Sequence, residues 1–167
     1  MKVRELMTTD VIACSPDTNL ATAASRMWEW DCGALPVVDE AGTFIGMITD
    51  RDICMAVATR HRLAAEILVR EVSSGAIYVC QPNDDVQLAL KTMRKEQVRR
   101  LPVVNAEGIL QGILSTNDLV LRTEAGKDQQ TTALSYEEVI STQKAIGEHR
   151  LPKAGRESEQ PPLATHA

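Results

Sequence analysis

The most constraining feature of this 167-residue chain is an internal duplication with an offset of 66 residues. The tetrapeptide LPVV at 35–38 returns at 101–104, and the tripeptide VRE at 3–5 returns at 69–71. Further residues return at the same offset: Cys14 as Cys80, Pro16 as Pro82, Met27 as Met93, Gly42 as Gly108, Gly46 as Gly112 and Asp52 as Asp118. This period is longer than the roughly 20–50 residues of solenoid and propeller repeats. We therefore expect two copies of a small α/β unit, related by an approximate twofold axis, with a cleft between them.

Length and charge limit the kind of protein that this chain can be. A chain of 167 residues can bury a core without metal or disulfide support, whereas each copy alone would be marginal. A net charge of −5 argues against general binding to nucleic acid or to an anionic membrane, since both require a positive field. No apolar leader follows Met1 and no run approaches 18 apolar residues. We expect a soluble protein of the cytoplasm.

The four cysteines contain no CxxC pair and lie in apolar or strand-like surroundings; they are Cys14, Cys32, Cys54 and Cys80. This usage favours a reduced, cytosolic protein in which the thiols are buried as small hydrophobic groups. A redox role for Cys14 or Cys32 stays open as an alternative.

Hydrophobic periodicity predicts the order β-α-β-β-α in each copy. In the first copy we expect a strand over 11–14, a helix from Leu20 with its cap at Asp17 or Thr18, strands over 34–38 and 44–49, and a helix from Asp50. In the second copy we expect a strand over 77–80, a cap at Asn83 or Asp84, a helix over 86–96, strands over 101–104 and 109–115, and a helix over 116–122. The residues at 61–68 that join the copies are helical in composition. The fold class is thus mixed, α/β (α+β), with two tandem β-α-β-β-α repeats.

The same reasoning divides the chain into four parts. Residues 1–66 form the first repeat and 67–124 the second, and together they make one module. Residues 125–152 form a helical extension, because Ser135 with Glu138 three positions later is a capping-box signature. This helix either covers the module or binds a partner. Residues 153–167 are rich in Pro, Glu and Gln, which predicts a disordered tail.

A short polar motif, which we call the polar phrase, lies at the end of the last strand of each copy. A hydroxyl residue, Thr49 or Ser115, is followed three positions later by an acid, Asp52 or Asp118, in the first turn of the next helix. One interpretation is a helix cap, in which the hydroxyl and the acid bind backbone N–H groups. The other is a nucleotide site, because a helix N-terminus favours phosphate and a carboxylate can accept ribose hydroxyls.

Arginines lie unevenly beside these phrases. Arg51 belongs to the first phrase, where the second has Asn117, and Arg99 with Arg100 precede the second LPVV where the first copy has Gly33 and an alanine. Guanidinium groups suit phosphate, and for Arg99 a solvated surface position is the simpler interpretation. We expect the two sites to differ in charge, which leaves open whether one site or both are occupied.

Taken together, these residues resemble the cystathionine-β-synthase (CBS) domain pair, or Bateman module, over about residues 3–122. The resemblance rests on the paired LPVV strands, the turn glycines and the phrases GMITDRD at 46–52 and GILSTND at 112–118. Within that family, GALP at 33–36 and MITDRDI at 47–53 are most similar to small stand-alone bacterial CBS-pair proteins, including those similar to hypoxic response proteins.

The resemblance implies a regulatory module that senses an adenosyl ligand in the cleft between the repeats. The implied ligands are AMP, ADP or ATP first, with S-adenosylmethionine and NAD as further candidates, and the implied assembly is a homodimer. The implied site residues are Thr49, Arg51, Asp52, Arg100, Ser115 and Asp118 for phosphate and ribose, and the backbone of Val11, Ile12, Ile77 and Tyr78 for adenine. One departure from the pattern is Thr116, which stands where the first copy has Asp50.

No catalytic constellation is visible in the sequence. The three histidines, His61, His149 and His166, give neither a nucleophile-base pair nor metal-ligand spacing. We therefore expect no enzyme activity, no required cofactor and no metal. The alternative to a sensor is a constitutive dimeric interaction or scaffold protein, whose phrases only cap helices and which binds no small molecule.

Overall fold

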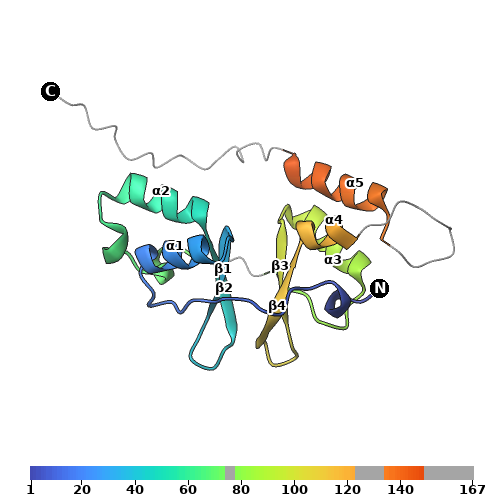
Figure 1. Cartoon of the computed structure of the whole chain (residues 1–167), viewed down its shortest axis with the longest axis horizontal. Coiled ribbons are helices and arrows are strands. Elements are labelled where there is room, and N and C mark those ends of the chain that lie inside the picture. Colours follow the sequence, from blue (N-terminus) through green and yellow to red (C-terminus); the bar gives the residue numbers. More distant parts are fainter. Residues whose placement is uncertain (74–77, 123–133, 149–167) are drawn as a thin grey trace, which may run out of the picture.

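A computed structural model describes residues 1–73, 78–122 and 134–148 of the chain. The two copies lie side by side, each with a two-stranded hairpin and a pair of helices at one end of it (Figure 1). The first copy contains α1 (Leu20–Glu29), β1 (Ala34–Val38), β2 (Phe44–Thr49) and α2 (Asp50–Arg60). The second contains α3 (Val86–Glu96), β3 (Arg100–Val104), β4 (Leu110–Ser115) and α4 (Thr116–Arg122), followed by α5 (Tyr136–Gly147). No helix in these ranges is long and apolar enough to span a membrane.

The two hairpins have the same register and touch at their tips. Leu35 pairs with Ile48 in the first hairpin, and Leu101 pairs with Leu114 in the second. Both turns use a glycine, Gly42 or Gly108, with a φ of 81°, a backbone conformation that a side chain would strain. The Phe44 N–H donates to Gly108 O at 3.0 Å, and the Leu110 N–H donates to Gly42 O at 3.2 Å. The strand tips therefore join the two copies.

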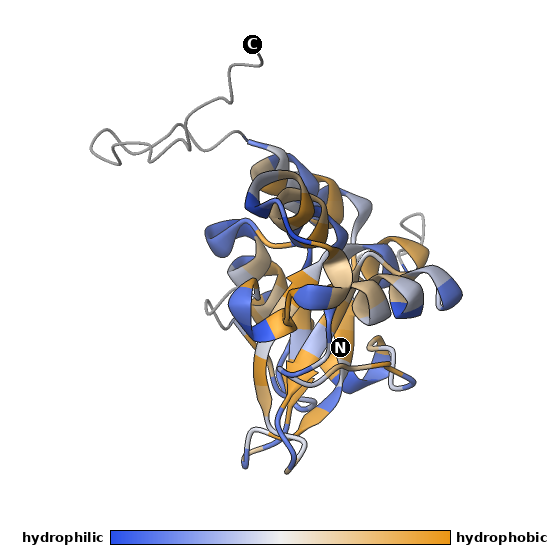
Figure 2. Ribbon diagram, turned by 90° about the vertical axis from the view of Figure 1, so that its left-hand side faces the viewer, coloured by the Kyte–Doolittle hydropathy of each residue, from blue (hydrophilic) through white to orange (hydrophobic). Residues whose placement is uncertain are grey.

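Each copy has its own apolar core, and strands and inner helix faces supply most of it (Figure 2). The core of the first copy includes the fully buried side chains of Leu20, Leu35, Ile48 and Ile67. The core of the second copy includes Val3, Leu90, Met93, Leu101, Leu114 and Leu119 together with Val139 of α5. α5 thus belongs to the packing of the second copy, and the first copy has no equivalent helix among the described residues.

The first residues of each copy complete the core of the other copy. We call residues 3–8 and 67–73 the lead segments. The Val3 side chain lies in the second core, and its N–H donates to Asp84 O at 3.0 Å. In return, Ile67 and Val69 lie in the first core, and the Val69 N–H donates to Thr18 O at 2.8 Å. This exchange ties the two copies into one folding unit.

Gly112 allows the first lead segment to lie against β4. Thr8 and Ile113 exchange both backbone hydrogen bonds, each at 2.9 Å. A Cβ at Gly112 would lie 2.6 Å from Thr8 O, which is closer than real carbon atoms approach a backbone oxygen. The repeated glycine therefore marks a close contact between two chain segments.

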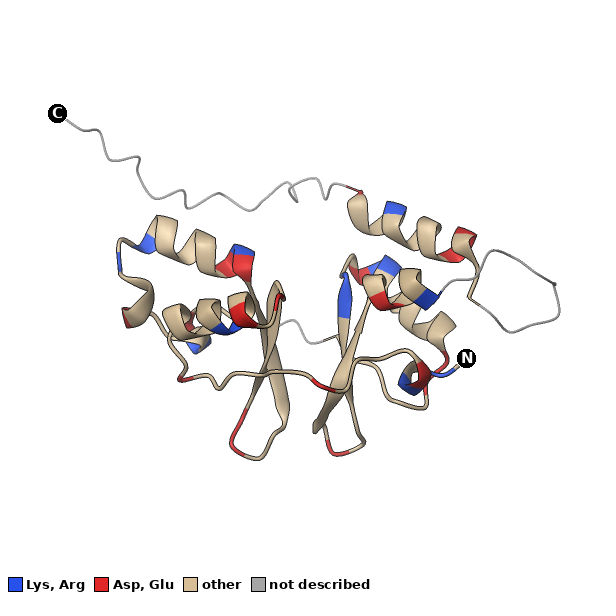
Figure 3. Ribbon diagram, viewed as in Figure 1, with Lys and Arg blue, Asp and Glu red and all other residues tan. Residues whose placement is uncertain are grey.

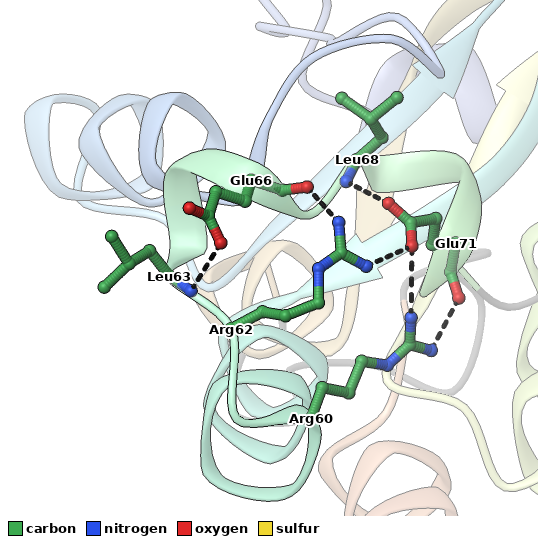
Figure 4. A network of polar contacts seen from close by, with 6 residues as sticks. All are labelled: Arg60, Arg62, Leu63, Glu66, Leu68 and Glu71. Carbon is green, nitrogen blue, oxygen red and sulfur yellow. Dashed lines mark hydrogen bonds and ion pairs between the residues drawn. The ribbon is translucent and has the colours of Figure 1, made fainter.

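The link between the copies differs from its predicted helical form. It contains only a short 3₁₀ turn, η2 (Ala64–Glu66), which leads into a second one, η3 (Val69–Glu71). The guanidinium of Arg62 donates to Glu71 Oε2 at 2.8 Å, and Arg60 donates to Glu71 O at 2.8 Å (Figure 4). The Arg62 hydrogen bond, and next the Leu68 N–H, hold the pKa of the Glu71 carboxyl below its usual range.

Further sequence expectations, about the first strand of each copy and about the caps of α1 and α3, are wrong. The run at 11–14 is extended but forms only one bridge, from Cys14 to Val37, and Cys80 likewise bridges Val103; Ile77 lies outside the described residues. Neither α1 nor α3 uses a predicted cap, since the cap residues are Asn19 and Asp85. The predicted caps serve other contacts: Asp17 pairs with Arg70, Thr18 accepts from Ser15, Asn83 accepts from Arg4 and Asp84 accepts from Gln81.

The cysteines fall into buried and accessible groups. Cys14 and Cys80 are buried at equivalent positions, as expected, and each thiol donates to the carbonyl of a strand proline. Burial raises the pKa of Cys14 to about 11 and that of Cys80 to about 12. Cys54 is exposed, which contradicts the expectation of four buried thiols, and Cys32 is half-buried. The redox interpretation of Cys14 is weakened, because a buried thiol with a raised pKa holds little reactive thiolate.

We expect Ile67→Ala to destabilise the whole chain by roughly 2–4 kcal/mol, because the side chain is fully buried in the core of the first copy. Urea unfolding followed by circular dichroism measures this change. The matched control is Leu63→Ala in the same link, where the side chain is 69 % exposed and the expected change is below about 0.5 kcal/mol. Equal effects of the two substitutions would contradict the exchange of lead segments.

We expect the unfolding free energy to fall as the pH rises above about 9. The unfolded chain loses its thiol protons near the ordinary pKa of 9.0, whereas folded Cys14 and Cys80 keep theirs up to a pKa of about 11 and about 12. Below pH 8 these thiols contribute no pH dependence. The measurement is urea unfolding from pH 7 to 11, and a Cys14→Ala, Cys80→Ala double variant is expected to show a shallower decline.

Candidate functional site

Both polar phrases form complete helix caps. The Thr49 hydroxyl donates to Asp52 Oδ2 at 2.7 Å, and the Asp52 backbone N–H donates to the Thr49 hydroxyl at 3.1 Å. Ser115 and Asp118 make the same pair of contacts, at 2.7 Å and 3.2 Å. In each of these capping boxes the same carboxylate oxygen, Oδ2, also accepts a hydrogen bond from the backbone N–H of the hydroxyl residue. The second carboxylate oxygen remains outside the cap, so capping alone does not use the full capacity of either acid.

A cavity of about 310 Å³ opens beside the second cap, and we call it the β4 cavity. Ser115 and Asp118 lie on one side of it, and Val11 and Ile12 of the extended first segment lie on another. Arg100, at the start of β3, also faces this space. The Thr8 hydroxyl lies 3.5 Å from Asp118 Oδ1, the carboxylate oxygen that the cap does not use. The cavity therefore combines an acid, a hydroxyl and a cation with apolar walls.

A second cavity of about 520 Å³ opens beside the first cap, and we call it the β2 cavity. Thr49 and Arg51 come from the cap itself, and Tyr78 comes from the extended segment of the second copy. Arg99 and Arg100 reach the same space. Under the 66-residue offset, Thr49 corresponds to Ser115 and Arg51 to Asn117, so the two cavities occupy equivalent places in the two copies.

The structure brings together most, but not all, of the predicted site residues. Val11, Ile12, Arg100, Ser115 and Asp118 line the β4 cavity. Thr49, Arg51, Tyr78 and Arg100 line the β2 cavity. Asp52 lines neither cavity, and Ile77 lies outside the described residues.

The two cavities have opposite charge, as the uneven arginines predict. Three guanidinium groups, those of Arg51, Arg99 and Arg100, face the β2 cavity beside one carboxylate, that of Asp50. In the β4 cavity the balance is reversed, because three carboxylates accompany Arg100; they belong to Asp10, Asp31 and Asp118. Figure 3 shows that residues of both charges occur where the strands join the helices.

Sequence reasoning missed several residues of this site. Thr8, Asp10 and Asp31 join the β4 cavity through chain segments that carry no motif. Gln97 and Ile146 line the β2 cavity, and Gln97 Nε2 donates to Ala145 O at 3.1 Å at the C-terminal end of α5. The extension thus forms one wall of the β2 cavity. Arg99 is exposed, as expected, and it also lines this cavity.

The family model for the CBS domain matches residues 3–59 and again residues 69–123. The chain belongs to the CBS domain family. The CBS domain-containing protein YhcV of Bacillus subtilis is 36 % identical over 119 residues, which cover 71 % of this chain and 83 % of YhcV. The inosine-5'-monophosphate dehydrogenase of Mycobacterium tuberculosis is 31 % identical over 68 % of this chain, but the aligned part is 21 % of that enzyme.

Solved CBS structures have the same fold. A crystal structure of Hypoxic Response Protein I with two coordinated zinc ions superposes with a TM-score of 0.67 and 31 % identity, covering 74 % of this chain and 100 % of that one. A crystal structure of CBSX2 in complex with AMP superposes with a TM-score of 0.64 and 26 % identity, covering 72 % and 93 %. The predicted fold class and the resemblance to stand-alone CBS pairs, including a hypoxic response protein, are confirmed.

Within residues 1–73, 78–122 and 134–148, no three His, Cys, Asp or Glu side chains are grouped as a metal site requires.

We expect Thr49→Ala to destabilise the fold by about 1 kcal/mol, because it removes the hydroxyl that caps α2. The matched control is Thr22→Ala on the exposed face of α1, where a change below about 0.5 kcal/mol is expected. Thermal unfolding of both variants without nucleotide measures the capping contribution alone. If Thr49→Ala and the control are equal, the hydroxyl does not stabilise the helix.

Proposed function

We propose that this chain is a non-catalytic sensor module that binds adenosyl ligands in its two cavities and signals through a change in conformation or assembly. The observation that carries the proposal is the convergence, in each cavity, of a strand-end hydroxyl, a guanidinium and a side chain from extended backbone, which is Val11 and Ile12 in the β4 cavity and Tyr78 in the β2 cavity. These are the groups that ribose, phosphate and adenine require. The complex of AMP with the related CBSX2 supports this ligand class.

The β2 cavity is the proposed site for a phosphorylated nucleotide, AMP, ADP or ATP. Arg51, Arg99 and Arg100 supply the positive charge that phosphate oxygens need, and Thr49 adds a hydroxyl at the N-terminus of α2. The ring of Tyr78 offers an apolar face to adenine. This assignment places the phosphates near Arg51 and the base near the start of the second copy.

The β4 cavity is the proposed site for an adenosyl ligand with little or no phosphate charge. Asp118 Oδ1, which the cap does not use and which the Thr8 hydroxyl contacts at 3.5 Å, can also accept a ribose hydroxyl, and Asp10 and Asp31 make the surroundings negative. Such a cavity disfavours triphosphate and suits S-adenosylmethionine, whose sulfonium is positive. The two sites thus select different members of one ligand class.

Binding is proposed to be transmitted through groups that both sites share. Arg100 and Ala34 line both cavities, one from each copy, so a ligand in either cavity contacts both copies. Ile146 of α5 lines the β2 cavity, so a nucleotide there also meets the extension. A ligand changes the arrangement only if it binds one arrangement better than another. The reporting assembly is proposed to be a homodimer, and the location is proposed to be the cytoplasm.

One observation favours a second candidate function, a constitutive dimeric scaffold without a small-molecule ligand. Both hydroxyl-acid phrases form capping boxes, so their presence is explained without any ligand. A scaffold of this kind predicts a stable dimer and no thermal shift with nucleotides.

Isothermal titration of the full chain with AMP, ATP and S-adenosylmethionine tests the proposal. Arg51→Ala is expected to weaken AMP and ATP binding by about tenfold or more, because a charge-assisted phosphate contact is lost. Asp118→Asn keeps an acceptor for the α4 cap and is expected to weaken S-adenosylmethionine binding instead.

Arg122→Ala is the matched control for Arg51→Ala, because it removes an exposed arginine of α4 that lines neither cavity. No change in affinity is expected from it. A ligand at 100 times its Kd is expected to stabilise the fold by about 2.7 kcal/mol in thermal shift assays. Heat-free titrations and unchanged melting with all three compounds would reject the sensor and leave the scaffold.

A further inference from the structure

The groove that α5 fills in the second copy has an open counterpart in the first copy. α5 lies across α3 and α4, where Arg94 donates to Thr142 and Gln97 donates to the carbonyls of Ala145 and Glu148. Under the 66-residue offset, the residues of this groove correspond to those lining a space of about 470 Å³ between α1 and α2. We call this space the α1–α2 groove. Its floor is apolar, formed by the buried side chains of Met27 and Ile53.

The α1–α2 groove differs from its counterpart in charge and in exposed apolar surface. Asp31 stands at the place of Gln97, and Asp50 stands at the place of Thr116. The groove is therefore acidic at the end where the other groove donates hydrogen bonds to the C-terminal carbonyls of α5. Its rim includes Trp28, which is 88 % exposed, and the exposed thiol of Cys54. An occupant must bring apolar side chains and a positive charge at that end.

α5 itself carries such a combination on a second stripe. Its buried stripe, with Val139 and Thr142, packs on the second copy. Beside it, at a spacing of four residues, lie Tyr136, 51 % exposed, Ile140, 52 % exposed, and the exposed Lys144. The lysine lies near the C-terminal end of the helix, which points toward the first copy in Figure 1.

We propose that the α1–α2 groove receives the Tyr136, Ile140 and Lys144 stripe of α5 from a second copy of this chain. A twofold axis lets each chain give one α5 and receive one, so both grooves are filled and the assembly closes as a dimer. Each α5 then lies between α3 and α4 of its own chain and α1 and α2 of the partner. Lys144 meets the Asp31 and Asp50 carboxylates, and the apolar stripe covers Trp28.

This inference names the surface of the homodimer in the proposed function, and it does not require that any nucleotide binds. Dimerisation through α5 can therefore hold when the sensor fails, and the sensor can hold when this dimer does not. Measurements of assembly without nucleotide separate the two.

Sedimentation of the full chain without nucleotide tests the proposal through charge reversal. The wild-type chain is expected to be a dimer, and Lys144→Glu and Asp31→Lys are each expected to weaken it by about tenfold or more. Combining the two substitutions is expected to restore dimerisation, because the charges are exchanged. Position 31 has a φ of 46°, and its counterpart Gln97, at 53°, shows that a long side chain fits this conformation.

Ile140→Glu is expected to weaken the dimer at least as strongly, and Leu88→Glu is its matched control. Leu88 on α3 is 53 % exposed and lies outside both surfaces, so its substitution is expected to leave the dimer unchanged. Far-ultraviolet circular dichroism checks that α5 remains helical in each variant.

A disulfide provides a second measurement that does not depend on affinity. Ile140→Cys is expected to cross-link to Cys54 of the second copy under mild oxidation with diamide, which gives a band of dimer mass on a non-reducing gel. The band is expected to disappear in the Ile140→Cys, Cys54→Ser variant and to be weak in Leu88→Cys.

Three outcomes would overturn the proposal. A wild-type chain that stays monomeric leaves the groove to a helix of another protein. A dimer that tolerates Lys144→Glu and Ile140→Glu uses a different surface. Growth into longer chains with increasing concentration would show a contact that does not close by a twofold axis.

Discussion

The exchange of lead segments is the interaction on which the rest of the structure depends. Val3 is buried in the second core, whereas Ile67 and Val69 are buried in the first, and each segment also holds the other copy through backbone hydrogen bonds. The close approach of Thr8 to β4, permitted by Gly112, belongs to the same exchange. Because the segments cross, the orientation of the two hairpins is fixed, and so are the two cavities between them.

The extended residues that follow the first lead segment illustrate how fold becomes site. Val11 and Ile12 follow shortly after the contact at Thr8, so the same crossing that builds the core also places these two apolar residues at the β4 cavity. The cavity faces a helix cap, which keeps Ser115 and Asp118 rigid. Stability and the capacity to bind thus come from the same short stretch of chain.

The 66-residue period was sufficient to predict the repeated elements, because strands such as 34–38 and helices such as 86–96 have strong periodic patterns. It did not predict the caps of α1 and α3, because several residues near each helix start can accept a backbone N–H and tertiary partners such as Arg4 and Arg70 decide which one does. The run at 11–14 has the apolar composition of a strand but meets only one backbone partner, at Cys14. Composition reports burial and does not report how many hydrogen bonds a neighbour offers.

For the candidate site, local motifs located Thr49, Ser115 and Asp118, and the uneven arginines indicated that the two sites differ in charge. Asp31 and Ile146 could not be located, because they reach the cavities through tertiary packing of segments without any motif. α5 also breaks the symmetry that the repeat predicts. It covers one pair of helices and leaves the equivalent pair open, so identical ancestry does not give the two halves identical surroundings.

The crossing of the lead segments also indicates how such a chain can arise. Each repeat begins with the VRE tripeptide, and that beginning is completed by the opposite repeat. Two separate polypeptides of one repeat each would satisfy the same contacts by lending each other their first residues. In the present chain the covalent link lets the two repeats carry different side chains while each still completes the core of the other.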